Sequence, residues 1–170
     1  LDLARRAYAY LEKNFRDRVH GGYVWLVDAD GRPLPGDKKV YGQAFAIYAL
    51  AEYHLATADA SGLAAARRVY ELLERHAHDD ANGGYLEACA ADWSPTQELR
   101  LSDGDMLAAK SMNTHLHVLE AYTTLYRAWP DSGVKARLRD LIALFGERIV
   151  DRAAGHLRPF FDERWNPLAE

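Results

Sequence analysis

Apolar side chains recur every three or four residues along five stretches of the chain, a spacing that places them on one face of an α-helix. These stretches predict helices over residues 3–15, 40–57, 63–77, 110–126 and 132–150. The second and fourth predicted helices are apolar around most of their circumference, whereas the others carry one apolar stripe. This alternation predicts an inner layer of helices, buried on most sides, and an outer layer of amphipathic helices.

A short motif repeats between the predicted helices. Gly-Gly-Tyr at residues 21–23 opens an aromatic and β-branched stretch, and the same three residues return at 83–85, 62 residues later. Each copy predicts a short strand, the first over residues 23–27, and a looser third copy lies at 155–161. Helical hairpins repeated at such a period bury their faces against their neighbours. The predicted fold is therefore all-α, part of an α/α toroid with short strands in its loops.

The repeat length sets the expected domain organisation. Six hairpins of about 60 residues each need roughly 350 to 400 residues to close a ring, and this chain has 170. We therefore expect residues 1–170 to form a single domain that is a fragment of a larger α/α barrel catalytic domain.

Composition and charge narrow the classes of partner. The chain is 49% hydrophobic and 27% charged with a net charge of -4, which excludes a disordered protein. No basic stripe is present, so we expect no nucleic-acid partner, and no apolar run is long enough to predict a membrane partner. The single cysteine, Cys89, excludes an internal disulfide and favours a reducing, cytoplasmic location. The oligomeric state is left open.

The predicted inner helix over residues 110–126 carries a strip of polar side chains. Asn113, His117, Glu120 and Thr124 follow one another at spacings of four, three and four, so they share one face. Two interpretations are about equally supported by this pattern. His117 is either a core histidine satisfied by Glu120 or a backbone carbonyl, or part of a ligand pocket in which a neutral imidazole near a helix N-terminus accepts or relays a proton.

The start of the other inner helix supports a pocket. If successive inner helices point the same way, Tyr41 lies at the same mouth as Asn113 and His117. Tyr41 alone is more typical of a core or interface position. Among the four tryptophans, Trp93 is the best candidate for the pocket rim, because it lies in a polar loop before an inner helix.

Metal and cofactor chemistry are disfavoured. The cluster at His76, His78, Asp79 and Asp80 lies at the exposed end of an outer helix beside a glycine turn. His115 and His117 are two residues apart on a helix and cannot share an ion. Phosphate-loop, dinucleotide-binding, serine-hydrolase and zincin motifs are absent from the sequence. We therefore expect no metal site and no cofactor.

Three segments resemble the N-acylglucosamine 2-epimerase superfamily: Lys39–Phe45, Ser111–Tyr122 and Leu157–Asp162. The run Thr-His-Leu-His-Val-Leu-Glu-Ala-Tyr, residues 114–122, is nearest to the members that act on cellobiose. The resemblance implies a six-hairpin α/α barrel that inverts C2 of the reducing-end glucose of a β-1,4-linked disaccharide such as cellobiose or lactose. The implied reaction passes through ring opening, abstraction of the C2 proton and a cis-enediolate.

The resemblance also implies roles for particular residues. His117 matches an essential pocket histidine that binds and polarises the sugar, and Asn113 and Tyr41 match sugar-contacting side chains. Ser102 and Asp105 fall in a loop that matches a further binding segment. The acid/base histidines and a substrate-binding arginine of the family are expected outside this chain. The implied partner is a small sugar, with no cofactor.

Other functions remain open from the residues alone. Within the superfamily the alternatives are an N-acylglucosamine 2-epimerase and an aldose–ketose isomerase of the mannose type. A glycoside hydrolase needs two carboxylic acids, which Asp92, Asp103 and Asp105 could supply. A non-catalytic helical-repeat binding module is the last alternative. The amide and imidazole strip suits proton transfer beside a carbonyl better than glycosidic cleavage.

Overall fold

The computed structural model describes residues 1–102 and 104–169. Five α-helices carry the described part of the fold, and two of them, α1 and α5, end in π-helical turns, η1 and η2. The helical segments are α1 (Asp2–Tyr10), η1 (Leu11–Phe15), α2 (Val40–Thr57), α3 (Ala60–His76), α4 (Met112–Ala128), α5 (Ser132–Leu144) and η2 (Phe145–Ile149). The strands are β1 (Lys38–Lys39), β2 (Ala88–Cys89), β3 (Lys110–Ser111), β4 (Val150–Asp151), β5 (His156–Leu157) and β6 (Phe160–Phe161).

All five predicted helices are present, with small differences at their ends. Helix α3 begins before the predicted residue 63, because the Asp59 carboxylate caps it by accepting a hydrogen bond from the Ser61 backbone N–H at 2.9 Å. Helix α4 begins at Met112, where Ser111 is the cap. The strand predicted over residues 23–27 is wrong. Only isolated bridges join Arg16 to Tyr23 and Val27 to Pro33, because the Tyr23 backbone N–H bonds a side chain of α2 instead of a neighbouring strand.

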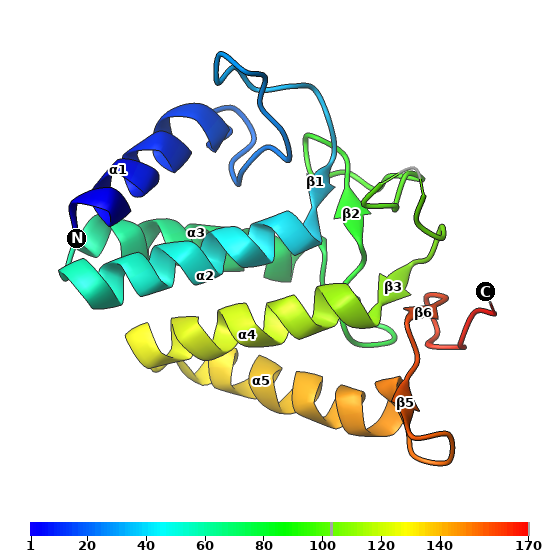
Figure 1. The fold of residues 1–170 in the computed structure, drawn as a ribbon. Helices are drawn as coiled ribbons and strands as arrows, with labels where there is room; N and C mark the ends of the chain where they lie inside the picture. Colours follow the sequence, from blue (N-terminus) through cyan, green and yellow to red (C-terminus); the bar gives the residue numbers. More distant parts are fainter. Residues whose placement is uncertain (103, 170) are drawn as a thin grey trace.

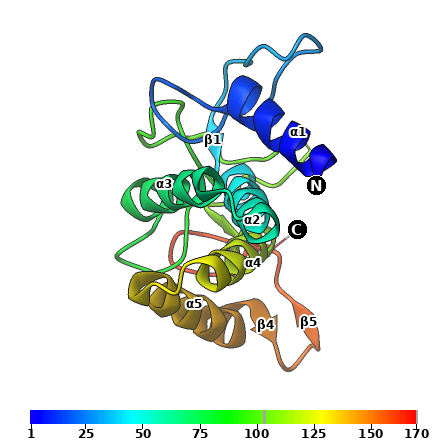
Figure 2. The same cartoon turned by 90° about the vertical axis from the view of Figure 1, so that its left-hand side faces the viewer.

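The helices form two layers, as the alternating pattern predicted. Helices α2 and α4 run side by side in the same direction, and α3 and α5 run back along one side of them (Figures 1 and 2). Ile47, Leu50, Val118 and Leu125 from the inner pair are fully buried. The all-α, α/α-toroid class is therefore confirmed.

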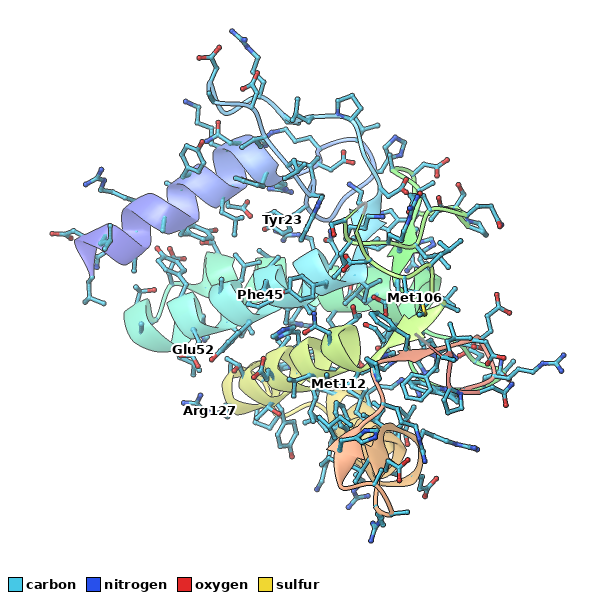
Figure 3. The ribbon with its side chains drawn as sticks, turned by 45° about the vertical axis from the view of Figure 1, so that its right-hand side comes forward. Tyr23, Phe45, Glu52, Met106, Met112 and Arg127 are labelled. Atoms are coloured by element: carbon cyan, nitrogen blue, oxygen red, sulfur yellow. The ribbon has the colours of Figure 1, made fainter. Side chains whose placement is uncertain are left out.

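Side chains also join the two inner helices directly. Figure 3 shows Phe45 on α2 and Met112 at the start of α4, with Glu52 and Arg127 further along the two helices. The Arg127 guanidinium lies 3.0 Å from the Glu52 carboxylate. The N-terminal ends of α2 and α4 consequently lie on the same side of the molecule, next to the short strands (Figure 1).

The short strands tie the loops to these N-terminal ends. Strands β1 and β2 pair antiparallel directly before α2, and β3 pairs with β6 directly before α4. A third pair, β4 with β5, closes the turn after η2. Each inner helix therefore starts from a backbone-paired residue, which fixes the position of its first turn.

The repeated Gly-Gly-Tyr motif has a repeated structural role. The backbone N–H of Tyr23 donates to Oε1 of Gln43 at 3.0 Å, and that of Tyr85 donates to Nε2 of His115 at 2.9 Å. Gln43 and His115 each occupy the fourth residue of an inner helix. We call this hydrogen bond the loop–helix clamp, because it holds each loop against the first turn of the next inner helix.

A buried ion pair accompanies each clamp. The Lys38 ammonium lies 2.5 Å from the Asp17 carboxylate, and the Lys110 ammonium lies 2.7 Å from the Asp79 carboxylate. Lys110 also donates to two backbone carbonyls, those of Gly83 and Glu163. Burial alone would raise the pKa of Asp79, but hydrogen bonds from Lys110 and Asn82 lower it to about 2. The third copy departs from this pattern, since Asp151 pairs with Arg158 at 2.8 Å.

The second glycine of each motif makes room for a tryptophan. Gly84 has a φ of +76°, and a Cβ there would lie 2.5 Å from Cζ2 of Trp165 and 2.7 Å from Nε2 of His115. Gly22 has a φ of +70° and meets Trp93 in the same way. Only glycine allows both this backbone conformation and this close approach.

His115 is the core histidine of the molecule. Its side chain is fully buried, Nδ1 donates to the Ser111 carbonyl at 2.6 Å, and Nε2 accepts from Tyr85. Burial lowers the pKa of His115 to about 4. The neutral ring is required, because protonation of Nε2 would remove the acceptor of the clamp.

We predict that Gly84→Ala is strongly destabilising in the full-length protein and that Gly83→Ala is not. Both residues have positive φ values, so each substitution costs about 1 kcal/mol of backbone strain. Space is open around Gly83, whereas Gly84→Ala adds a clash that costs roughly a further 2 kcal/mol. Denaturant unfolding of the two variants measures the difference, and equal losses of stability would contradict the close-approach argument.

His115→Gln copies the residue of the first clamp into the second, and we predict that it removes a pH-dependent loss of stability. The pKa of His115 is about 4 in the folded protein against 6.5 ordinarily, so the unfolded chain binds an extra proton between these values. Stability contributed by the neutral ring is complete above pH 6.5 and falls as pH decreases, by about 2 kcal/mol at pH 5. Unfolding free energies at pH 7 and pH 5 measure this loss.

The control for this experiment is His156→Gln, because His156 is an exposed histidine. The parent and the control should lose about 2 kcal/mol more than His115→Gln on going from pH 7 to pH 5. An identical pH dependence in all three proteins would show that His115 is not the group responsible.

Candidate active site

His117 packs against two aromatic residues of the neighbouring inner helix, which also contact each other. The centre of its ring is 4.8 Å from that of Tyr41 and 4.6 Å from that of Phe45. Tyr41 in turn meets the edge of Trp25 at 6.0 Å. The structure therefore brings together Tyr41 and His117, as the parallel inner helices predicted, and adds two aromatic residues to them.

The contacts of His117 include features of both interpretations. Nδ1 lies 2.8 Å from Oε2 of Glu120, as the core-histidine interpretation expected. The side chain is nevertheless 19% exposed, and among the described residues Nε2 has no hydrogen-bond partner. His115 differs from His117, because both of its ring nitrogens are satisfied inside the protein. His117 is thus held at one nitrogen and available at the other.

Trp25, Tyr41 and Phe45 line an open groove of about 470 Å³ between η1 and α2, and His117 is not among its lining residues. Phe45 is 41% exposed. Phe45 and Trp25 were not identified from the sequence as candidate site residues. A signal for Phe45 was present, because it stands 72 residues before His117 and Tyr41 stands 72 residues before Asn113. The two pairs occupy equivalent positions of consecutive inner helices.

Asn113 is exposed one turn before His117 and lines a small cavity of about 90 Å³. Asp105 and the buried Glu87 line the same cavity. Glu87 accepts hydrogen bonds from the Ser111 backbone N–H and the Thr114 hydroxyl, both at 2.7 Å, while burial raises its pKa to about 7. Glu87 was also missed, although a carboxylate within an apolar stretch was a visible signal.

Ser102 and Asp105 bond to each other. The backbone N–H and the hydroxyl of Ser102 donate to Oδ2 of Asp105 at 2.8 and 2.9 Å. Both residues are exposed, and of the two only Asp105 lines the cavity beside Asn113. Asp103, a candidate for the hydrolase alternative, lies outside the described residues. Asp92, the other candidate, is exposed and bonds to Ser94 in its own loop.

The expectation that Trp93 forms the pocket rim is wrong. Its side chain is only 3% exposed, and its indole N–H donates to the His20 carbonyl at 3.1 Å. Trp93 packs against Gly22, as Trp165 packs against Gly84. A tryptophan at this repeat position supports the loop–helix clamp, which explains its burial.

The histidines and aspartates at the end of α3 and in the loop after it contact different residues and do not converge on one point. His76 packs against Trp93, His78 bonds to Asp80 at 2.8 Å, and Asp79 pairs with Lys110. Within residues 1–102 and 104–169 no group of three histidine, cysteine or carboxylate side chains is placed to hold a metal ion. Over the same residues, no helix combines the length and apolar character needed to cross a bilayer.

Residues 1–170 match the N-acylglucosamine 2-epimerase (GlcNAc 2-epimerase) family. A cellobiose 2-epimerase from Bacteroides fragilis is 43% identical over 164 residues, covering 96% of this chain and 42% of the relative. A solved cellobiose 2-epimerase from Spirochaeta thermophila superposes with a TM-score of 0.90 at 42% identity, covering 98% of this chain and 41% of that one. One from Bacillus thermoamylovorans gives 0.93 at 38% identity, covering 98% and 43%.

The chain spans less than half the length of these relatives. The match nevertheless includes every segment that carries the aromatic, amide and imidazole groups of the candidate site. The sequence resemblance, the layered helical hairpins and the superposition all agree. The chain belongs to the N-acylglucosamine 2-epimerase family.

Proposed function

We propose that the complete protein is a carbohydrate epimerase of the cellobiose 2-epimerase type and that this chain supplies one wall of its sugar site. The observation that carries the proposal is the position of His117, in contact with Tyr41 and Phe45 and one turn after Asn113. The relatives named cellobiose 2-epimerase, at 33 to 43% identity, support the substrate class. The substrate would be a β-1,4-linked disaccharide such as cellobiose or lactose.

The aromatic side chains suit a sugar ring. Trp25, Tyr41 and Phe45 offer apolar surface in an open groove, and a few polar groups beside such a surface fix the orientation of a ligand. Asn113 offers an amide, and its small cavity is large enough for water or a sugar hydroxyl group. Ser102 would act on the sugar through Asp105, whose carboxylate it holds with two hydrogen bonds.

His117 would bind and polarise the open-chain sugar. Glu120 orients the ring by accepting a hydrogen bond from Nδ1, which leaves Nε2 for the substrate. When both ring nitrogens carry a proton, Nε2 donates to the carbonyl oxygen and stabilises the negative charge that develops when the C2 proton is removed. The resulting cis-enediolate would regain a proton on its opposite face. The acid and base of this exchange are proposed to lie in other segments of the complete protein.

The reaction product separates this proposal from its alternatives. We predict that the full-length protein, incubated with cellobiose in deuterated water, inverts C2 of the reducing-end glucose and incorporates deuterium there, because the C2 proton exchanges with solvent. Nuclear magnetic resonance of the product measures both changes. A ketose product would indicate an aldose–ketose isomerase, and released glucose a glycoside hydrolase. Turnover of N-acetylglucosamine but not cellobiose would indicate an N-acylglucosamine 2-epimerase, and no turnover a binding module.

A single substitution tests the role of His117. In the full-length protein, His117→Ala should lower kcat by about 100-fold or more, the usual loss when a positioned proton-transfer or polarising group is removed. The folded structure should persist, because water can solvate Glu120, which is already exposed. His156→Ala is the matched control. A kcat within about threefold of the parent would assign His117 to the core and reject its role on the sugar.

A further inference from the structure

A second groove lies between the loop at residues 16–23 and α3, and His117 is not among its lining residues. Its volume is about 470 Å³. Ala65, Val69 and Leu72 of α3 give it an apolar side. Every cationic side chain that lines it is an arginine. We call it the arginine groove after these four residues, Arg16, Arg18, Arg68 and Arg75.

Positive charge in the arginine groove is only partly balanced. Arg16 pairs with Glu12 at 3.2 Å, and Asp17, one of two acidic lining residues, is held by Lys38. The other acidic lining residue is Glu71. Among the described residues Arg68 and Arg75 form no ion pair and no side-chain hydrogen bond, and both are exposed. Two guanidinium groups are thus free to meet a ligand.

The second repeat contains an equivalent groove in which acidic lining residues outnumber the two arginines, Arg137 and Arg148. This acidic groove, of about 390 Å³, lies between the loop at residues 78–84 and α5. Its residues follow those of the arginine groove 62 positions later in the loop and 72 positions later in the helix. The corresponding residues are His78 for Arg16, Asp80 for Arg18, Asp140 for Arg68 and Glu147 for Arg75. None of the four arginines has an arginine or a lysine as its counterpart.

Comparison of the two grooves distinguishes the residues that build the loop from the residues that line the groove. Both grooves keep the elements that build the loop: the aspartate paired with a buried lysine, the two glycines and the clamp to the inner helix. The same fold therefore forms with arginines or with acidic residues around the groove. Folding of this loop and helix does not require the arginines. We therefore take their concentration in one groove as evidence for a ligand.

We propose that the arginine groove binds a phosphate-bearing small molecule. A guanidinium group matches the oxygens of a phosphate with two parallel hydrogen bonds, which an ammonium group does not. The volume is in the range of small-molecule sites, and the apolar side accommodates the uncharged part of a phosphate ester. The ligand can therefore be free phosphate or a phosphate ester, and the two are distinguished by experiment.

Binding is tested on the full-length protein by isothermal titration calorimetry with inorganic phosphate, D-glucose 6-phosphate and D-glucose. We expect D-glucose 6-phosphate to bind with a Kd below about 1 mM. Its binding should weaken as salt is added. D-glucose should not bind at this groove. Tighter binding of the ester than of inorganic phosphate identifies an ester, and equal binding identifies free phosphate. Absence of binding by both anions overturns the proposal.

The groove is located by a double substitution, Arg68→Ala with Arg75→Ala. Both side chains are exposed and unpaired among the described residues, so the variant should melt like the parent while its affinity for the anion falls at least tenfold. Arg139→Ala removes an exposed arginine of α5 outside both grooves and should bind like the parent. Unchanged affinity in the double variant overturns the assignment, and so does an equal loss in Arg139→Ala.

Discussion

The hydrogen bond from the backbone N–H after each Gly-Gly pair to the fourth residue of the next inner helix determines the rest of the structure. It is made by Tyr23 to Gln43 and by Tyr85 to His115. An unpaired backbone N–H inside a protein is costly, so the acceptor cannot be given up without loss of stability. The glycines allow the loop to approach the helix closely, and the tryptophans pack against those glycines. The buried lysine–aspartate pairs hold the same loops in place.

The clamp has a direct consequence for the candidate site. Because the same contact fixes the first turn of α2 and of α4, equivalent positions of the two helices reach the same side of the molecule. One such pair is Tyr41 and Asn113, and the other is Phe45 and His117. The ring contact between Phe45 and His117 at 4.6 Å follows from this equivalence. The site is thus assembled from a repeat in which polar groups replace aromatic ones.

The sequence predicted what depends on periodicity. The helix over residues 40–57 is found with the predicted ends, and the approach of Tyr41 to His117 follows from parallel inner helices. Contacts between distant loops were not predictable in the same way. Trp93 looked like a rim residue because its loop is polar, yet it fills the space that Gly22 leaves. Its burial depends on a contact across about 70 residues, which no local pattern records.

Internal repetition also separates what the fold requires from what it tolerates. The acceptor of the clamp is a glutamine in the first repeat and a histidine in the second, so the fold requires an uncharged acceptor of the right length. His115 meets this requirement only as a neutral ring. At the inner face, phenylalanine and histidine alternate, so an imidazole is not needed there for packing. The polar character of His117 is therefore not explained by the fold, and this is the physical argument for the proposal that a ligand meets His117 on the inner face.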